Sequence, residues 1–489
     1  MTMKKIMIIY VLSLTAALFS GCTSDDPFEN ASSGWNNGGN MGGGNTSNGK
    51  LTSFDVTVDT TTPEPVTTVS AYYPDGEDVL ANNTFSTEVI IDLSNPVAKT
   101  ENGVEVTVNG GHITANHGSE KKVCYVVSGS TSNGSFTVLG EKKYAVKLNG
   151  VSITNPDSAA LNLLSSKRAF VIMTEGTTNT LTDGSGGSQK GALYCKGKLL
   201  FNGSGSLTVS GNSKNGIHSA DYIVFNKGNN VHVTSSVKHG IKANDGIFIN
   251  GGILNIEVKA ADAKGMNCES HILFNGGRTI VLAGGNNSEG IQADSTLTIA
   301  GGEVICHAYD DAINSKGDMM ITGGYVYAHG QDNDGLDANG NCYIQGGTVY
   351  AICSGSPEVA IDANTEGGKK LYITGGTIVA IGGLENGSSL TQACYQTQSW
   401  SSSTWYALTV DDSTFSFYTP TSGGSGLVVS GDSQPALKSG VSVSGGTSLF
   451  GGLAIANGTV SGGSSISLSS YTGGSGMNGG PGGGPGGWH

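Results

Sequence analysis

The chain of 489 residues contains 78 glycines, has only 13 % charged residues and carries a formal net charge of −14. So much glycine argues against a helical protein, whereas abundant Ser, Thr, Val, Ile, Asn and Gly are typical of many short strands joined by tight turns. The negative charge argues against nucleic-acid binding, because phosphate contacts need clustered Lys and Arg, and it suits cation binding and solubility.

The N-terminus predicts a secreted, lipid-anchored protein. Residues 1–21 combine a positively charged start with an apolar stretch that is too short for a comfortable membrane span, as in a signal peptide. The sequence Phe-Ser-Gly-Cys ending at Cys22 resembles a bacterial lipobox, and the acidic tetrapeptide after it resembles the export tag of surface lipoproteins in gut-dwelling Gram-negative anaerobes. We therefore expect lipidation of Cys22 and a position on the outer membrane, facing outside, because buried acyl chains act as anchors.

The next segments predict a tether and a cap. Residues 22–50 are rich in Gly, Asn and Ser, as a flexible linker is, and residues 51–90 are β-rich and should form an N-terminal cap. The seven cysteines after Cys22 form no Cys-x-x-Cys pair and have no His partners at zinc-ligand spacing, and their odd number argues against a full set of disulfides. Four of them fall at inward positions of the repeat described next and are expected in the core: Cys195, Cys268, Cys306 and Cys342.

Residues 91–385 contain a repeat that determines the fold. Three short segments in each repeat alternate apolar and polar residues, which indicates strands with one buried face. Such short strands and tight turns fit one coil of a three-sided parallel β-helix, whereas a propeller blade needs about 40 residues and four longer strands. The repeat is marked by six Gly-Gly pairs at steps of 25, 25, 22, 23 and 29 residues, beginning at Gly251, Gly276, Gly301, Gly323, Gly346 and Gly375.

A second marker, an apolar residue that follows Gly or Ala, runs in phase with the Gly-Gly pairs. Because coils stack about 4.8 Å apart, these residues should form one inward ladder, and the core should grow along one axis. The Gly-Gly corners need a backbone freedom that residues with a Cβ lack. The sequence therefore predicts an all-β fold, a single-stranded parallel β-helix (β-solenoid) with β-rich N- and C-terminal caps. The ladder members are Ile217, Ile241, Met266, Ile291, Ile313, Leu336 and Ile361.

The residues after the repeat predict a second cap. Residues 386–471 contain an aromatic loop with Trp400, Trp405 and Tyr406 and further β segments. Residues 472–489 repeat Gly-Gly-Pro and are expected to be disordered.

Acidic residues concentrate in three consecutive coils of the C-terminal half. Asp337 and Asp362 should lie one coil apart on the same face, where like charges destabilise unless they are protonated, solvated or bridged by a cation. Ca²⁺ takes six to eight oxygen ligands at about 2.3–2.6 Å, and zinc is disfavoured because no Cys or His shares the cluster. The alternative is a solvated acidic edge without an ion. The predicted calcium ligands are Asp310, Asp311, Asp332, Asp334, Asp337, Glu358 and Asp362.

Tyrosines at outward positions lie beside the acids. On a rigid sheet, exposed tyrosines can stack on sugar rings, since each ring has an apolar face and a polar tip. The alternative is ordinary cross-strand stabilisation. The candidate carbohydrate-binding residues are Tyr325, Tyr327, Tyr343, Tyr350 and Tyr372.

Residues 90–385 resemble carbohydrate-binding β-helix proteins related to pectate lyases, which are known from cellulose-degrading bacteria. The resemblance is carried by residues 146–153 (VKLNGVSI), by residues 175–184 (EGTTNTLTDG) and by the Gly-Ile and Gly-Gly markers. It implies a right-handed helix, bound calcium and affinity for plant-type or acidic polysaccharides, with no demonstrated enzyme activity. That family often has Asp before the Gly-Ile marker, and here only Asp311 and Asp334 keep it, so calcium should concentrate toward the C-terminal half.

These observations favour a monomeric, calcium-dependent polysaccharide-binding protein without catalysis. The first alternative is a polysaccharide lyase, in which calcium acidifies the proton α to a uronate carboxylate and a base removes it. Lys316 is the only base we nominate, and a charge-balancing role for it is the simpler interpretation. The second alternative is a structural adhesin or stalk, in which calcium serves rigidity alone. A glycosidase that uses two of the clustered acids also stays open.

Overall fold

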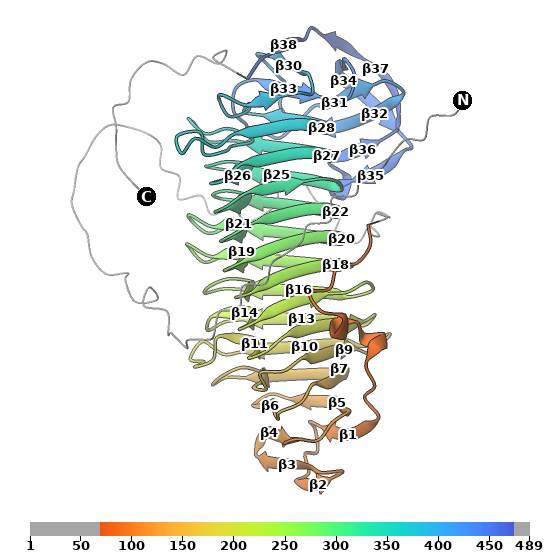
Figure 1. The fold of residues 1–489 in the computed structure, drawn as a ribbon, viewed down its shortest axis with the longest axis vertical. Coiled ribbons are helices and arrows are strands. Elements are labelled where there is room, and N and C mark those ends of the chain that lie inside the picture. Colours follow the sequence, from red (N-terminus) through yellow and green to blue (C-terminus); the bar gives the residue numbers. More distant parts are fainter. Residues whose placement is uncertain (1–68, 474–489) are drawn as a thin grey trace, which may run out of the picture. The chain divides into compact units, whose positions relative to one another are not determined.

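The computed structural model describes residues 69–473, which form an almost entirely β structure. Its strands stack in parallel as a β-solenoid of about 11 turns, along the long axis of Figure 1. The predicted β-helix is therefore confirmed. The predicted signal peptide, Cys22, the tether, residues 51–68 and nearly all of the Gly-rich tail lie outside the described residues.

A 12-stranded sheet forms one face of the solenoid and contains the predicted inward ladder. Parallel pairs join Ile313 to Leu336 and Leu336 to Ile361, and all seven predicted ladder residues are fully buried, so the predicted register is confirmed. The strands of this sheet are β2 (Lys99–Glu101), β3 (Val104–Asn109), β4 (Gly111–Asn116), β6 (Gly134–Leu139), β8 (Leu161–Leu163), β11 (Gly191–Cys195), β14 (Asn215–Ser219), β17 (Ile241–Ala243), β19 (Lys264–Cys268), β21 (Glu289–Ala293), β23 (Ile313–Ser315) and β26 (Leu336–Ala338).

A 20-stranded sheet makes up the rest of the solenoid wall and its C-terminal end. Its longer strands bend from one face to the next, and their pairing shifts register at the Gly-Gly positions. Its strands are β1 (Thr87–Asp92), β5 (Val123–Thr131), β7 (Tyr144–Asn155), β9 (Ala169–Met173), β10 (Thr178–Asp183), β12 (Leu199–Gly203), β13 (Ser206–Gly211), β15 (Tyr222–Phe225), β16 (Asn230–Ser235), β18 (Gly246–Val258), β20 (His271–Ala283), β22 (Leu297–Ala308), β24 (Met319–Ile321), β25 (Tyr325–Gly330), β27 (Cys342–Cys353), β28 (Leu371–Ile381), β29 (Ser389–Leu390), β30 (Cys394–Thr397), β33 (Leu427–Ser430) and β38 (Ser469–Tyr471).

The Gly-Gly corners require glycine for two reasons. The second glycine of every pair has a positive φ, from +77° at Gly324 to +96° at Gly376. At Gly347, whose φ is +80°, an added Cβ would lie 2.8 Å from the backbone of Gly323 and Gly324 in the preceding coil. Both the backbone conformation and the close approach of stacked coils therefore exclude larger residues.

Residues 69–86, which we call the strap, run along the outer face of the solenoid. The sequence predicts a β-rich cap over 51–90, but this described part of it contains no strand before β1. It forms two 3₁₀ helices, η1 (Gly76–Asp78) and η2 (Leu80–Asn82), and the Asp75 side chain caps η1. The strap covers an apolar outer patch that includes Phe170, Leu200 and Phe248.

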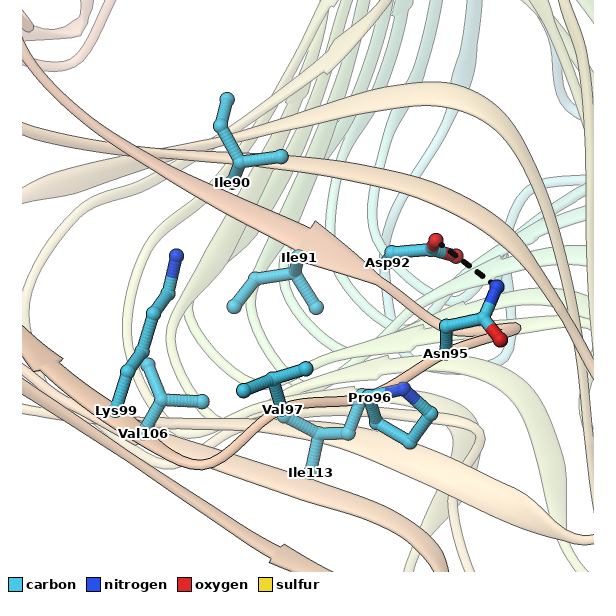
Figure 2. Close-up of a pocket in the computed structure, with 9 residues that line it drawn as sticks. All are labelled: Ile90, Ile91, Asp92, Asn95, Pro96, Val97, Lys99, Val106 and Ile113. Atoms are coloured by element: carbon cyan, nitrogen blue, oxygen red, sulfur yellow. Dashed lines mark hydrogen bonds between the residues drawn. The ribbon is translucent and has the colours of Figure 1, made fainter.

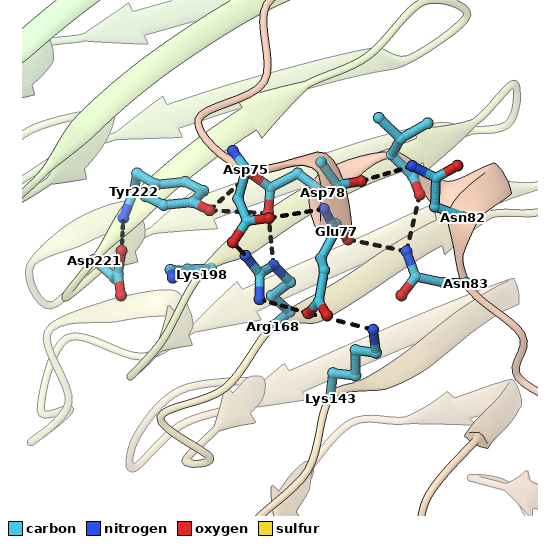
Figure 3. Close-up of polar contacts among 12 residues, drawn as sticks. Asp75, Glu77, Asp78, Asn82, Asn83, Lys143, Arg168, Lys198, Asp221 and Tyr222 are labelled. Carbon is cyan, nitrogen blue, oxygen red and sulfur yellow. Dashed lines mark hydrogen bonds and ion pairs between the residues drawn. The ribbon is translucent and has the colours of Figure 1, made fainter. Parts of the chain in front are cut away.

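Polar contacts fasten the strap to the coils, as Figure 3 shows. Arg168 forms ion pairs with Asp75, Glu77 and Asp78, and its Nε lies 2.7 Å from Asp78 Oδ1. The hydroxyl of Tyr222 also donates to Asp78, which is fully buried. A buried carboxylate is thus satisfied by a guanidinium and a phenol from two different coils.

Residues after the last coil close its end and also cover part of its side. Strands β30, β33 and β38 pair antiparallel at the end of the solenoid. A separate six-stranded antiparallel sheet packs on the outer face of the last coils through Phe417 and Phe450. This sheet consists of β31 (Trp405–Val410), β32 (Ser413–Tyr418), β34 (Ala436–Ser444), β35 (Thr447–Leu449), β36 (Ala454–Ala456) and β37 (Thr459–Ile466), with η3 (Phe450–Gly452) between β35 and β36.

The described cysteines are all buried and unbridged, and the four expected in the core are fully buried there. No helix within residues 69–473 is long and apolar enough to cross a membrane.

Candidate metal and carbohydrate site

Three carboxylates from two successive coils meet on the outside of the C-terminal half. Asp337 lies on β26, Asp334 shortly before it, and Asp362 follows Ile361, the partner of Leu336 in the next coil. One carboxylate oxygen from each of these three residues lies within 4.8 Å of the others. The structure therefore places Asp337 and Asp362 one coil apart on the same face, as the near-identical sequences Leu-Asp-Ala-Asn (336–339) and Ile-Asp-Ala-Asn (361–364) predict.

Two of the predicted ligands, Asp311 and Asp334, also bond the backbone of the following coil. Asp311 Oδ1 accepts a hydrogen bond from the backbone N–H of Asp334 (3.0 Å), and Asp334 Oδ1 accepts one from that of Val359 (2.8 Å). Asn314 Nδ2 donates to the second oxygen of Asp311 (3.2 Å). Both oxygens of Asp311 thus have partners within the protein, while Asp334 keeps one oxygen for the cluster.

The other three predicted acids form a more accessible rim. Asp332 and Glu358 are exposed, and Asp310 is half-buried and accepts from Asn333 Nδ2 at 2.9 Å. Burial raises the pKa of Glu358, and the charges of Asp310 and Asp332 raise it further. The seven predicted ligands therefore divide into an inner cluster and a rim, which we together call the acidic face.

Burial and mutual repulsion strongly perturb the inner carboxyl groups. Burial raises the pKa of Asp334 to about 10, that of Asp362 to about 8 and that of Asp337 to about 7. Neighbouring carboxylates add to each shift, Asp311 acting on Asp334 and Glu385 on Asp362. Within residues 69–473, no Lys or Arg forms an ion pair with any of the seven acids. Among the described residues, no Lys or Arg is therefore paired with these carboxyl groups to balance their charge when they ionise.

The structure adds three oxygen-bearing residues that the sequence analysis did not nominate. Asn314 Nδ2 donates to Asp337 Oδ2 (2.5 Å), while its buried Oδ1 has no hydrogen-bond partner. Glu289 Oε1 pairs with Lys264 Nζ (2.7 Å), and its buried Oε2 has no partner. Glu385 follows Leu384, which pairs with Ile361 in the ladder. The sequence Gly-Leu-Glu ending at Glu385 repeats the Gly-Leu-Asp pattern of Asp337, and this signal could have identified it.

The donor set fits calcium better than zinc. It consists of carboxylate oxygens and one amide oxygen, the hard ligands that Ca²⁺ prefers. The buried Oδ1 of Asn314 accepts no hydrogen bond, so its lone pairs are free to coordinate a metal ion. Zinc ligands such as Cys or His do not belong to the cluster found among the described residues.

The two expected tyrosines Tyr327 and Tyr350 are not available to a sugar, and that prediction is wrong. They are 3 % and 0 % exposed, because the six-stranded sheet covers the outer face on which they lie. The ring of Tyr350 lies 5.3 Å from that of Phe417, and its hydroxyl donates to the carbonyl oxygen of Tyr418 (2.9 Å). Strand alternation predicts which side chains leave the solenoid core, but it does not show what packs on them.

The remaining candidate tyrosines are more accessible. Tyr343 on β27 and Tyr372 on β28 are half-exposed and stacked, with ring centroids 5.0 Å apart and an interplanar angle of 9°. Tyr325 is half-buried and packs against the cluster beneath the six-stranded sheet. The Tyr343–Tyr372 pair is therefore the aromatic platform that the predicted set provides.

Lys316, the nominated lyase base, is engaged elsewhere. Its Nζ forms an ion pair with Asp294 Oδ1 at 2.8 Å, and its side chain is 52 % exposed. This contact is the charge-balancing role that was the simpler interpretation.

A polar groove lies beside the acidic face. It has a volume of about 610 Å³ and lies between the loop at Glu358 and the C-terminal cap, where Asn386, Gln398 and Tyr471 contribute to its walls. A smaller cavity of about 170 Å³ at the N-terminal end (Figure 2) is lined mainly by apolar residues such as Ile91 and Val97 and contains none of the seven predicted calcium ligands. Of these two, it is the larger groove that adjoins the acidic face, through Glu358.

The fold and the site make this chain a parallel β-helix protein with an acidic, oxygen-rich face beside a polar groove. The family of carbohydrate-binding domain-containing proteins matches residues 109–284 and 266–448, well over half of the chain, and the chain belongs to this family. Carbohydrate binding, with polysaccharide as the partner, follows from that membership.

Two further comparisons add no functional assignment. No curated protein matches the chain. A polysaccharide lyase-like protein from C. thermocellum, solved as a gadolinium derivative, matches with 19 % identity and a TM-score of 0.36, over 53 % of this chain and 96 % of that one. At that TM-score the likeness supports no argument about fold or function.

Proposed function

We propose that the protein binds polysaccharide in a calcium-dependent manner, without catalysis, at the acidic face and the adjoining groove. The observation that carries this proposal is the cluster of Asp334, Asp337 and Asp362, whose carboxylate oxygens lie within 4.8 Å of one another. Like charges at this separation destabilise a fold, and a divalent cation would convert the repulsion into shared attraction.

The inner cluster would hold the ion and the rim would face the glycan. Asp334, Asp337 and Asp362 supply carboxylate oxygens, and the unpartnered Oδ1 of Asn314 is a further donor. Bound calcium would supply positive charge and open coordination positions for sugar oxygens. Glu358, which belongs both to the rim and to the groove, connects the two parts of the site.

The stacked pair Tyr343 and Tyr372 would add an apolar contact for a sugar ring. The two rings lie on neighbouring coils and stack nearly parallel, so the outer ring of the pair can offer a flat aromatic face that its neighbour supports. Aromatic rings with a polar tip suit such amphipathic partners.

The absence of catalysis is supported by the position of Lys316. A general base must reach the proton it removes, directly or through one water. The Lys316 ammonium is instead held by Asp294. We therefore place binding before the lyase alternative.

We also propose that the chain is anchored at the cell surface through lipidated Cys22. The support is the sequence at residues 1–26, which resembles a lipoprotein signal with an acidic export tag. Incorporation of labelled palmitate into the wild-type protein, and its loss in Cys22→Ala, would support this anchoring. Surface proteolysis of intact cells would distinguish the outer from the inner face of the membrane.

The binding proposal is tested with the mature chain on pectin, polygalacturonate and cellulose, with calcium and with chelator. The expected result is a calcium-dependent increase in affinity of at least tenfold, which Asp337→Asn/Asp362→Asn removes, without ultraviolet absorbance from unsaturated product. Asp262→Asn, at an exposed acid outside the acidic face, is the matched control and should bind normally. Product formation would favour the lyase, and failure to bind any glycan with calcium would leave the stalk.

A further inference from the structure

Four lysines line a cavity at the opposite end of the solenoid from the acidic face. Lys121 and Lys122 precede β5, and Lys142 and Lys143 precede β7. The cavity has a volume of about 340 Å³, and strap residues 82–85 form its other wall. A volume of this order is within the range of small-ligand pockets.

Two of these lysines, Lys122 and Lys143, belong to a column of positive charge that follows the coils. The strand register places Lys122 beside Lys143, Lys143 beside Arg168, and Arg168 beside Lys198. Equivalent positions in stacked coils lie about 4.8 Å apart, so four like charges in succession repel one another. On a chain with a net charge of −14, such a column is not explained by overall composition.

The carboxylates of the strap form ion pairs with only some of these cations. Arg168 is paired with three strap carboxylates, and Lys143 Nζ lies 3.4 Å from Glu77 Oε2 (Figure 3). Lys121, Lys122 and Lys142 form no ion pair with any residue of the part of the chain that the structure describes. Three ammonium groups at one cavity are thus left for an external anion.

The other features of the cavity indicate what kind of anion fits. Phe85 is half-buried and lies against Phe170, with ring centroids 5.2 Å apart, so it provides a supported aromatic surface. Asn82, Asn83 and Thr84 add hydrogen-bonding groups. An aromatic surface beside several cations fits a ring with an apolar face and a negative substituent.

Lys122 also has an unusual backbone conformation. Its φ is +61°, in the left-handed region that residues with a Cβ rarely adopt. A strained residue retained at a concave, charged site is the kind of outlier that accompanies a binding function.

We propose that this cavity is a second, calcium-independent binding site, which takes an anionic sugar through its carboxylate or sulfate group. The three uncompensated lysines bind the anion and Phe85 contacts the sugar ring. The site does not depend on the acidic face, because no residue of the predicted calcium cluster belongs to it.

The test uses the full mature chain in chelator, with calorimetric titration of three tetrasaccharides. Hyaluronan carries carboxylates only, chondroitin sulfate adds sulfate, and chitotetraose is neutral. Both anionic probes are expected to bind and the neutral one is not, with affinity falling as salt rises. A difference between the anionic probes distinguishes carboxylate from sulfate recognition. Absence of binding by both at low salt would overturn the proposal.

Variants separate this cavity from general electrostatic attraction. Lys122→Gln/Lys142→Gln should weaken binding of the anionic probes about 25-fold, at about fivefold per lysine. Lys196→Gln removes an exposed lysine outside the cavity and should leave affinity within twofold. Equal losses in the two variants would contradict the proposal. Asp337→Asn/Asp362→Asn should bind these probes normally in chelator, so this site and the calcium site can fail independently.

Discussion

The N-terminal and C-terminal halves of the solenoid share one interior but carry different outer surfaces. In both halves the inward ladder is apolar and fully buried, as at Ile241 and Leu336. The next residue along the chain points outward, and there Lys242 in one half corresponds to Asp337 and Asp362 in the other.

The two halves differ in the sign of the charges on their outward ladder positions and also in whether those charges have ion-pair partners. In the N-terminal half, Lys242 pairs with Glu269 (3.0 Å), so a charge on the outer ladder has a partner. In the C-terminal half, the Asp337 and Asp362 carboxyl groups lie near one another and near Glu385, and no Lys or Arg within residues 69–473 pairs with them. Charges that lack a partner among the described residues, rather than charges as such, therefore mark the candidate ligand sites of the solenoid.

The largest expected effect is the loss of stability when a buried tyrosine, rather than an accessible one, is replaced. Tyr350→Ala should destabilise the fold by about 4 kcal/mol, because it leaves a cavity beneath the six-stranded sheet. Tyr372→Ala removes half of a half-exposed stack and should cost about 1 kcal/mol or less, while weakening glycan binding. Urea unfolding and glycan titration of both variants measure this contrast. Equal stability losses would contradict the burial described for Tyr350.

The next effect concerns the corners common to both halves. Gly347→Ala combines a positive φ with a backbone clash and should destabilise by about 3 kcal/mol. Gly368→Ala is the matched control, since its φ of +76° is similar but its Cβ would meet nothing within 4 Å. It should cost only about 1 kcal/mol. If the two variants unfold at the same urea concentration, close coil stacking is not what requires glycine.

A smaller effect concerns the pH dependence of the C-terminal half. The pKa values of Asp337 and Asp362 are raised to about 7 and about 8, so the native state binds more protons than the unfolded chain. The stability this contributes is present below the ordinary carboxyl pKa and is lost as pH rises through 7 and 8. In chelator, the melting temperature should fall by roughly 5 °C from about pH 5 to about pH 9.

Calcium and substitution sharpen this pH test. Calcium should restore the melting temperature at the higher pH, because it binds the ionised cluster of the native state. Asp337→Asn/Asp362→Asn should make the pH profile less steep, leaving the part that Asp334 contributes, and should remove the response to calcium. An unchanged slope in this variant would place the titrating groups elsewhere.

The smallest effect is expected at Lys316. Lys316→Gln removes an exposed ion pair with Asp294, so stability should change by about 0.5 kcal/mol or less. Glycan affinity should stay within about twofold, and no unsaturated product should form with either protein. Loss of a lyase activity in the variant would show that Lys316 acts as a base.

Much of the fold could be predicted because each coil repeats the same physical requirements. The spacing of Gly-Gly pairs and of residues such as Ile313 and Leu336 sets both the corners and the register. The strap carries no such period, so its 3₁₀ helices and its contact with Arg168 required the structure. The position of the six-stranded sheet could not be predicted either, because the strands within residues 386–471 pack on coils that lie far away in the sequence.

The candidate site was predictable where it follows the ladder. The similar sequences around Asp337 and Asp362 predict that the two side chains lie next to each other. The same Gly-Leu-acid pattern at Glu385 predicts a further member of the site. The orphaned oxygen of Asn314 and the burial of Tyr327 depend on three-dimensional packing, and no local pattern specifies them.

The strap also decides how a mechanical load enters the molecule. Its contacts run along the solenoid from the Tyr72 N–H on Asn250 Oδ1 (2.7 Å), through the Tyr73 hydroxyl on Asn226 Oδ1 (2.8 Å), to Asp78 on Arg168 and Phe85 on Phe170. A pull on the chain upstream of residue 69 would therefore load the Asn250 contact before the Arg168 contact and would reach β1 last. The strap contacts are thus arranged in series, so they would break in turn before the N-terminal end of the solenoid opens.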